Sequence, residues 1–70
     1  MKKKLLILKS GSQYYRFSGG KFEGCDLNKA SVYPVDQIEA VLGKRNILFQ
    51  SGISSAEIKL LTIIEEDYKE

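Results

Sequence analysis

Gln13–Cys25 reads QYYRFSGGKFEGC, with two aromatic runs on either side of Gly19-Gly20. A Gly-Gly pair between strand-like runs is typical of a two-residue β-hairpin. The predicted register places aromatic opposite aromatic and positive charge opposite negative, which stabilises cross-strand pairs. The pairs expected are Ser18–Lys21, Phe17–Phe22, Arg16–Glu23, Tyr15–Gly24 and Tyr14–Cys25.

A further strand precedes this hairpin. Lys3–Lys9 contains the uninterrupted apolar run Leu5–Leu8, which is typical of a central strand buried on both faces. Ser10-Gly11-Ser12 supplies the turn, and either two-residue loop within it leads to the same alternation of faces. One face then carries the predicted core residues Leu6, Leu8, Tyr15, Phe17 and Phe22. The other carries Leu5, Ile7, Tyr14, Arg16 and Cys25.

A helix is predicted over Pro34–Leu42, where apolar residues recur at helical spacing. Pro34 suits the first helical position, and Gly43 is expected to cap the C-terminus. Lys44 and Arg45 follow where the helix dipole favours cations. The next segment, Asn46–Ser51, is compatible with either a strand or a second helical turn.

Residues 56–68 carry conflicting signals, some for a helix and some for a strand. Ser54-Ser55-Ala56-Glu57 has the spacing of a capping box, but Ile58–Ile64 is rich in β-branched residues. We predict a strand antiparallel to the first strand, because that pairing brings Glu65-Glu66-Asp67 near Lys2-Lys3-Lys4. Two solvated chain ends are the alternative to this charge pairing.

Length and composition indicate one domain spanning residues 1–70. Seventy residues lie near the lower limit for an unaided core, and 43% apolar content suffices for folding. The expected fold class is α+β: a small antiparallel sheet of N-terminal strand, Gly-Gly hairpin and C-terminal strand, with one helix packed on one face. The apolar run Leu5–Leu8 is too short for a signal peptide or a membrane span, so we expect a cytoplasmic protein without membrane partners.

Several features argue against catalysis. The chain has no histidine, which removes the commonest general base and metal ligand. Cys25 is the single cysteine, so there is no internal disulfide and no thiolate–imidazole pair. Gly19-Gly20-Lys21 and Gly43-Lys44 lack the spacing of a phosphate-binding loop. We therefore expect no enzyme, cofactor, metal or small-molecule substrate.

Charge is distributed unevenly along the chain. Residues 1–35 carry seven Lys/Arg and two Asp/Glu (+5), whereas residues 36–70 carry four and seven (−3). The basic, aromatic hairpin makes a nucleic-acid-binding module the alternative function, since single-strand binders stack bases on such strands. The expected alternation of faces leaves only Tyr14, beside Arg16, free to stack.

The segment Asp26–Tyr33 (DLNKASVY) leads from the strands into the helix. With this order of elements, the chain resembles small orphan α+β proteins of phages and mobile elements. The resemblance implies no catalytic residues. It implies a regulatory protein that binds a host or element-encoded macromolecule, for example an inhibitor of host defence.

The working surface expected from these patterns is the sheet face that the helix leaves bare. Its predicted partner-binding residues are Leu5, Ile7, Tyr14 and Arg16, an apolar patch with two favoured interface anchors. We expect it to make a homodimer or to dock a partner protein. Leu5, Ile7 and Tyr14 should then be exposed in an isolated chain.

Overall fold

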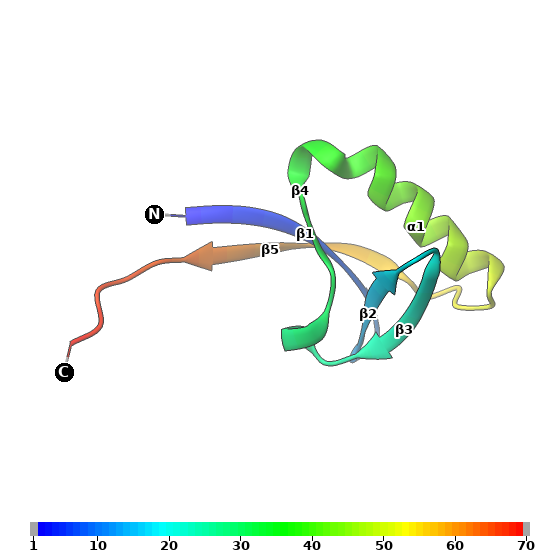
Figure 1. Ribbon diagram of the computed structural model, residues 1–70, viewed down its shortest axis with the longest axis horizontal. Helices are drawn as coiled ribbons and strands as arrows, with labels where there is room; N and C mark the ends of the chain where they lie inside the picture. Colours follow the sequence, from blue (N-terminus) through cyan, green and yellow to red (C-terminus); the bar gives the residue numbers. More distant parts are fainter. Residues whose placement is uncertain (1, 70) are drawn as a thin grey trace.

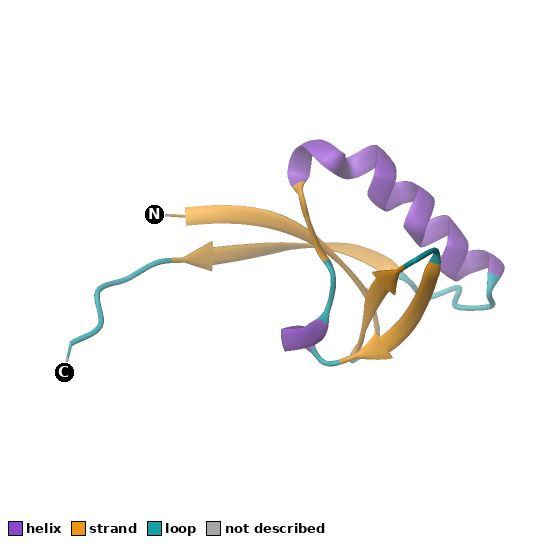
Figure 2. Ribbon diagram, viewed as in Figure 1, coloured by secondary structure: helices purple, strands orange, loops and turns teal. Residues whose placement is uncertain are grey.

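β1 is the strand around which the sheet assembles. In the computed structural model, which describes residues 2–69, β5 pairs antiparallel with β1 from Lys2 to Lys9. The other edge of β1 is shared, because β2 pairs with its last two residues and β4 with Leu5–Ile7. The strands are β1 (Lys2–Ser10), β2 (Gln13–Ser18), β3 (Lys21–Cys25), β4 (Val32–Pro34) and β5 (Glu57–Ile64). The α+β class and the antiparallel sheet are confirmed (Figures 1 and 2).

The hairpin of β2 and β3 has the predicted register from Ser18–Lys21 to Tyr14–Cys25. Both loop residues, Gly19 and Gly20, have positive φ, as the type I′ turn requires. Before the hairpin, the loop is Gly11-Ser12, because Ser10 pairs with Gln13. The local turn chemistry therefore sets the pairing of the first three strands.

β4 pairs with β1, and the residue just before it is bonded to β2. The Oγ of Ser31 accepts a hydrogen bond from the backbone N–H of Phe17 at 2.9 Å, and the Ser31 N–H donates to the carbonyl oxygen of Tyr15 at 3.1 Å. These bonds hold the start of β4 against β2, while the rest of β4 continues along β1. The end of the segment that leads into the helix is thus a strand of the sheet.

The helix differs from its predicted bounds of Pro34–Leu42. A 3₁₀ turn, η2 (Val35–Gln37), leads into α1 (Ile38–Gln50), so the ambiguous segment after Arg45 is helical. Gly43 lies inside α1 rather than capping it. The helix continues because its next turns bring Leu48, seven residues after Val41, into the core, and both side chains are fully buried.

The core lies between α1 and the sheet face that we call the front face. Val41 and Leu48 of α1 pack on Leu6, Leu8 and Tyr15, with Ala56 completing the cluster. Half-buried side chains surround it, and they include Phe17 and Phe22 as the alternation predicted. Tyr33, Ile53 and Ile58 belong to the same shell.

The chain ends do not form the predicted charge pairs. The antiparallel pairing of β1 with β5 is confirmed, but its register places Lys2, Lys3 and Lys4 opposite Ile64, Ile63 and Thr62. The acidic residues begin one position beyond the partner of Lys2, and no ion pair joins the two ends within residues 2–69. This part of β1 and β5 instead projects as a two-stranded ribbon, and the molecule measures 47 × 24 × 22 Å (Figure 1).

Candidate protein-binding face

The candidate site lies on the side of the sheet opposite α1, which we call the back face. Alternate residues of a strand point to the same face, and residues paired across strands share that face. The back face therefore receives side chains from four strands. The back face is formed by Leu5, Ile7 and Lys9 of β1, Tyr14 of β2, Val32 and Pro34 of β4, and Glu57, Lys59 and Leu61 of β5.

The expected exposure of Leu5 and Ile7 is wrong. Leu5 is 8% exposed and Ile7 is 2% exposed. β4 and β5 flank these residues on both edges, so that Leu5 lies between Pro34 and Leu61. Both side chains are therefore buried within the chain, and at Ile7 the turn that follows β3 adds to this cover.

The turn that covers Ile7 is η1 (Leu27–Lys29), which follows β3. Leu27, Tyr14 and Leu61 surround a shallow hollow of about 210 Å³ with Ile7 in its lining. This volume is below the range of about 300–1,000 Å³ that is usual for small-molecule pockets. The hollow is large enough for one side chain of a partner protein and small for a whole small-molecule ligand.

Two lysines border the hollow. The Nζ of Lys9 lies 4.9 Å from the centre of the Tyr14 ring, a cation–π distance. The Nζ of Lys59 lies 2.7 Å from Oε2 of Glu57, and this hydrogen bond and charge lower the pKa of the Glu57 carboxyl. Lys9 has no carboxylate within 4 Å among residues 2–69, although Glu57 is its cross-strand partner. Two lysines and one glutamate therefore leave a net positive charge beside the apolar interior of the hollow.

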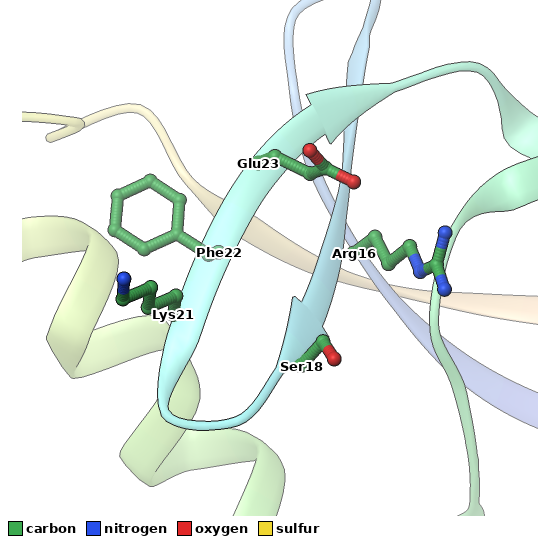
Figure 3. A pocket seen from close by; sticks show the side chains of 5 residues that line it. All are labelled: Arg16, Ser18, Lys21, Phe22 and Glu23. Atoms are coloured by element: carbon green, nitrogen blue, oxygen red, sulfur yellow. The ribbon is translucent and has the colours of Figure 1, made fainter.

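Arg16 lies outside this hollow. It lines a second depression on the hairpin with Ser18, Lys21, Phe22 and Glu23 (Figure 3). Its guanidinium points away from Lys21 and Phe22, and it makes no ion pair with its cross-strand partner Glu23 in the part of the chain described. Of the four predicted site residues, the structure brings Tyr14 next to Ile7, buries Leu5, and leaves Arg16 exposed at a distance along β2.

The residues around the hollow that were not predicted from the sequence include Lys9, Lys59 and Leu61, which follow from the strand pairing, and Leu27, which lies outside the strands. Leu27 lies in a segment, Asp26–Lys29, whose polar neighbours indicate only a turn. The one feature of the sequence that indicates a contact is an apolar residue, Leu27, among the polar residues of this turn. Leu27 is 45% exposed, and it lines the hollow together with Ile7.

Cys25 ends β3 as a half-buried free thiol. Its carbonyl oxygen accepts a hydrogen bond from Nε2 of Gln13 at 3.1 Å. No group of three His, Cys, Asp or Glu side chains gathers at a metal-binding spacing within the described residues. The chemistry that this site offers is therefore apolar contact, cation–π contact and attraction of anions.

Comparison of the chain with protein-family models, with curated proteins and with solved structures found no match. The one α-helix of the described chain is too short and too polar to cross a membrane.

Proposed function

We propose that this chain is a small, non-enzymatic protein-binding domain whose back face receives an apolar side chain of a partner protein beside an acidic group. The observation that carries the proposal is the hollow of Tyr14, Leu27 and Leu61 with Lys9 at its border. Aromatic and apolar anchors within a polar rim are typical of protein interfaces. The positive border selects partners that present a carboxylate next to the inserted residue.

The proposed contact residues differ in part from those predicted from the sequence. Tyr14 keeps its role as a contact residue, Ile7 becomes part of the lining, and Leu27 replaces Leu5 as an exposed apolar contact. Arg16 lies farther along the same strand and extends the positive charge. We propose a regulatory role in the cytoplasm, with a host or element-encoded protein as the partner, as the resemblance to small phage and mobile-element proteins would imply.

The absence of histidine from the chain supports a non-enzymatic role. The hollow is also shallow and open, whereas catalytic sites need a pocket in which polar groups converge. Binding to the partner is therefore the property to measure.

A nucleic-acid-binding module is the second candidate, favoured by one observation. Lys9, Tyr14 and Arg16 place two cations and one aromatic ring along the back side of β1 and β2. This arrangement offers one stacking position beside phosphate contacts.

Two variants separate these candidates. Leu27→Lys removes the apolar contact and adds a cation, so it should weaken a protein partner but strengthen binding to phosphates. Ile47→Lys is the matched control, because Ile47 is similarly exposed, 40% against 45%, and lies on α1 across the molecule. Binding partners are captured from the native cell with the wild-type chain and identified by mass spectrometry. Their affinities are then measured for all three proteins.

The expected result is a protein partner whose dissociation constant rises at least about tenfold with Leu27→Lys and stays unchanged with Ile47→Lys. A single-stranded RNA or DNA oligomer, tested by fluorescence anisotropy, should bind weakly, and any binding should fall steeply with salt. Tighter oligomer binding by Leu27→Lys, with no protein partner sensitive to it, would replace the proposal with the nucleic-acid candidate.

A further inference from the structure

β5 has one unpaired edge. Its eight residues pair with β1 along one side, and no other strand within residues 2–69 occupies the opposite side. The strand contains neither proline nor glycine, and the run Leu60–Ile64 carries no charge. Leu60 and Ile64 are 54% and 53% exposed. A long apolar edge of this kind is a template for pairing with another strand, because its N–H and C=O groups lack partners.

We propose that this edge pairs with β5 of a second copy of the chain, forming an antiparallel two-fold dimer centred on Thr62. Two identical antiparallel neighbours are related by an axis perpendicular to the sheet. Each residue then pairs with a residue whose side chain points to the same face of the sheet, and the central residue pairs with its own copy. The sheets of the two copies join into one, with both front faces on the same side.

Charge and apolarity select the register. With Thr62 at the centre, Lys59 faces Glu65 of the second copy, and the symmetry makes this pair twice. Leu60 then faces Ile64 and Leu61 faces Ile63, so every apolar residue between the charged pairs meets an apolar residue. Centring on Leu61 would place Glu57 opposite Glu65, and centring on Ile63 would place Leu61 opposite Glu65, in each case at the first residue beyond β5. With Thr62 at the centre, the unfavourable pairs of Ile58 with Glu66 and Glu57 with Asp67 fall farther beyond the end of β5, where the chain is no longer a strand. Centring on Leu60 would leave Lys59 opposite Leu61.

The helices support the same arrangement. On α1, Lys44 lies over the rings of Phe17 and Tyr33, at 5.3 and 5.6 Å, so this flank faces β2 and β4. Ile38, Leu42 and Phe49 lie on the opposite flank by helical spacing, and all three are exposed. Because β5 lies on the edge of β1 opposite β2 and β4, that flank faces the β5 side of the sheet. Because the two front faces share one side, the two apolar flanks face each other across the axis.

This dimer goes beyond the proposed function and uses a different surface. It covers the β5 edge and the α1 flank, whereas partner binding uses Tyr14, Leu27 and Lys9 on the back face. Lys59, Leu60 and Leu61 line the hollow and also belong to the β5 edge, so Leu27→Lys, which lies outside β5, tests partner binding alone. Loss of one property therefore leaves the other measurable.

The first test is a charge exchange followed by sedimentation over a concentration series. The wild type should reach twice the monomer mass of 7.9 kDa. Lys59→Glu or Glu65→Lys alone should raise the dimer dissociation constant at least about tenfold, and the double variant should restore it. Lys21→Glu, at the hairpin turn, is the matched charge reversal and should change nothing. Circular dichroism of each variant establishes that it is folded.

The second test probes the register by disulfide formation in a Cys25→Ser background. Thr62→Cys should cross-link two chains under mild oxidation, since facing residues have Cα atoms about 4.5–5.5 Å apart, within disulfide range. Leu60→Cys should not, because four residues of offset separate it from its own copy by about 14 Å. A wild type that stays monomeric throughout the series would overturn the dimer. Equal cross-linking at both positions, or no recovery in the double charge variant, would overturn this register.

Discussion

The backbone N–H of Ile53 donates to the carbonyl oxygen of Leu48 at 2.9 Å, and this bond determines where α1 ends. Gly52 lies between them with φ +92° and donates to the carbonyl oxygen of Phe49 at 3.1 Å. Together the two bonds form a Schellman motif, whose apolar contact joins Ile53 and Leu48 in the core shell. Gly52 therefore has the capping role that the sequence analysis assigned to Gly43.

Replacement of the two glycines by alanine should change stability in opposite directions. Gly43→Ala should stabilise the fold by about 0.5–1 kcal/mol, because it adds helix propensity where an added Cβ meets nothing within 4 Å. Gly52→Ala should destabilise it by about 1–2 kcal/mol, because alanine is strained at positive φ. Urea denaturation of both variants measures this. A destabilising Gly43→Ala would mean that the helix ends near Leu42.

The last turns of α1 can be tested with adjacent residues of different burial. Leu48→Ala should cost about 2–5 kcal/mol, because Leu48 is fully buried in the core cluster. Ile47→Ala should cost less than about 1 kcal/mol, because its side chain is exposed. Thermal and urea melts compare the two variants. Equal losses at both positions would contradict the placement of Leu48 in the core.

Ser31 supports the junction of β2 and β4, and Ser31→Ala should remove the acceptor for the Phe17 N–H. Leaving this partly buried donor without a partner should cost about 1–3 kcal/mol. Hydrogen exchange of the Phe17 amide should accelerate more than that of the hairpin amides farther from Ser31. Ser31→Thr keeps the hydroxyl and serves as the control, so its Phe17 amide should remain protected.

The Glu57–Lys59 pair should produce a small pH dependence at acid pH. The folded-state pKa of the Glu57 carboxyl is lowered, mainly by the hydrogen bond from Lys59 and also by the positive charge of Lys59. The pair therefore stabilises the fold above the unfolded-state pKa of Glu57, and this contribution is lost as the pH falls through the folded-state pKa. The effect on stability is small because both side chains are more than half exposed.

NMR titration of the Glu57 carboxyl measures this pKa directly. In the wild type it should lie below the ordinary range of glutamate, and Lys59→Met should raise it towards that range. A Glu57 pKa that is unchanged by Lys59→Met would show that the pair does not form in solution.

The hairpin follows from its residues alone, because a two-residue Gly-Gly loop accepts positive φ at both positions and leaves one register. The sequence also determines which side chains face the helix, since alternation along a strand follows from backbone geometry alone. β5 was predictable for a similar reason: its β-branched residues favour an extended chain wherever it lies.

The end of α1 and the exposure of the back face depend instead on tertiary contacts. Gly43 and Gly52 are equally suitable caps by residue type, and the core contact of Leu48 selects the second. Leu5 and Ile7 have the pattern of an open face, but both are buried within the chain, between β4 and β5 and, at Ile7, beside the Leu27 turn. Both outcomes depend on residues distant in the chain coming into contact, and local pattern carries no information about such contacts.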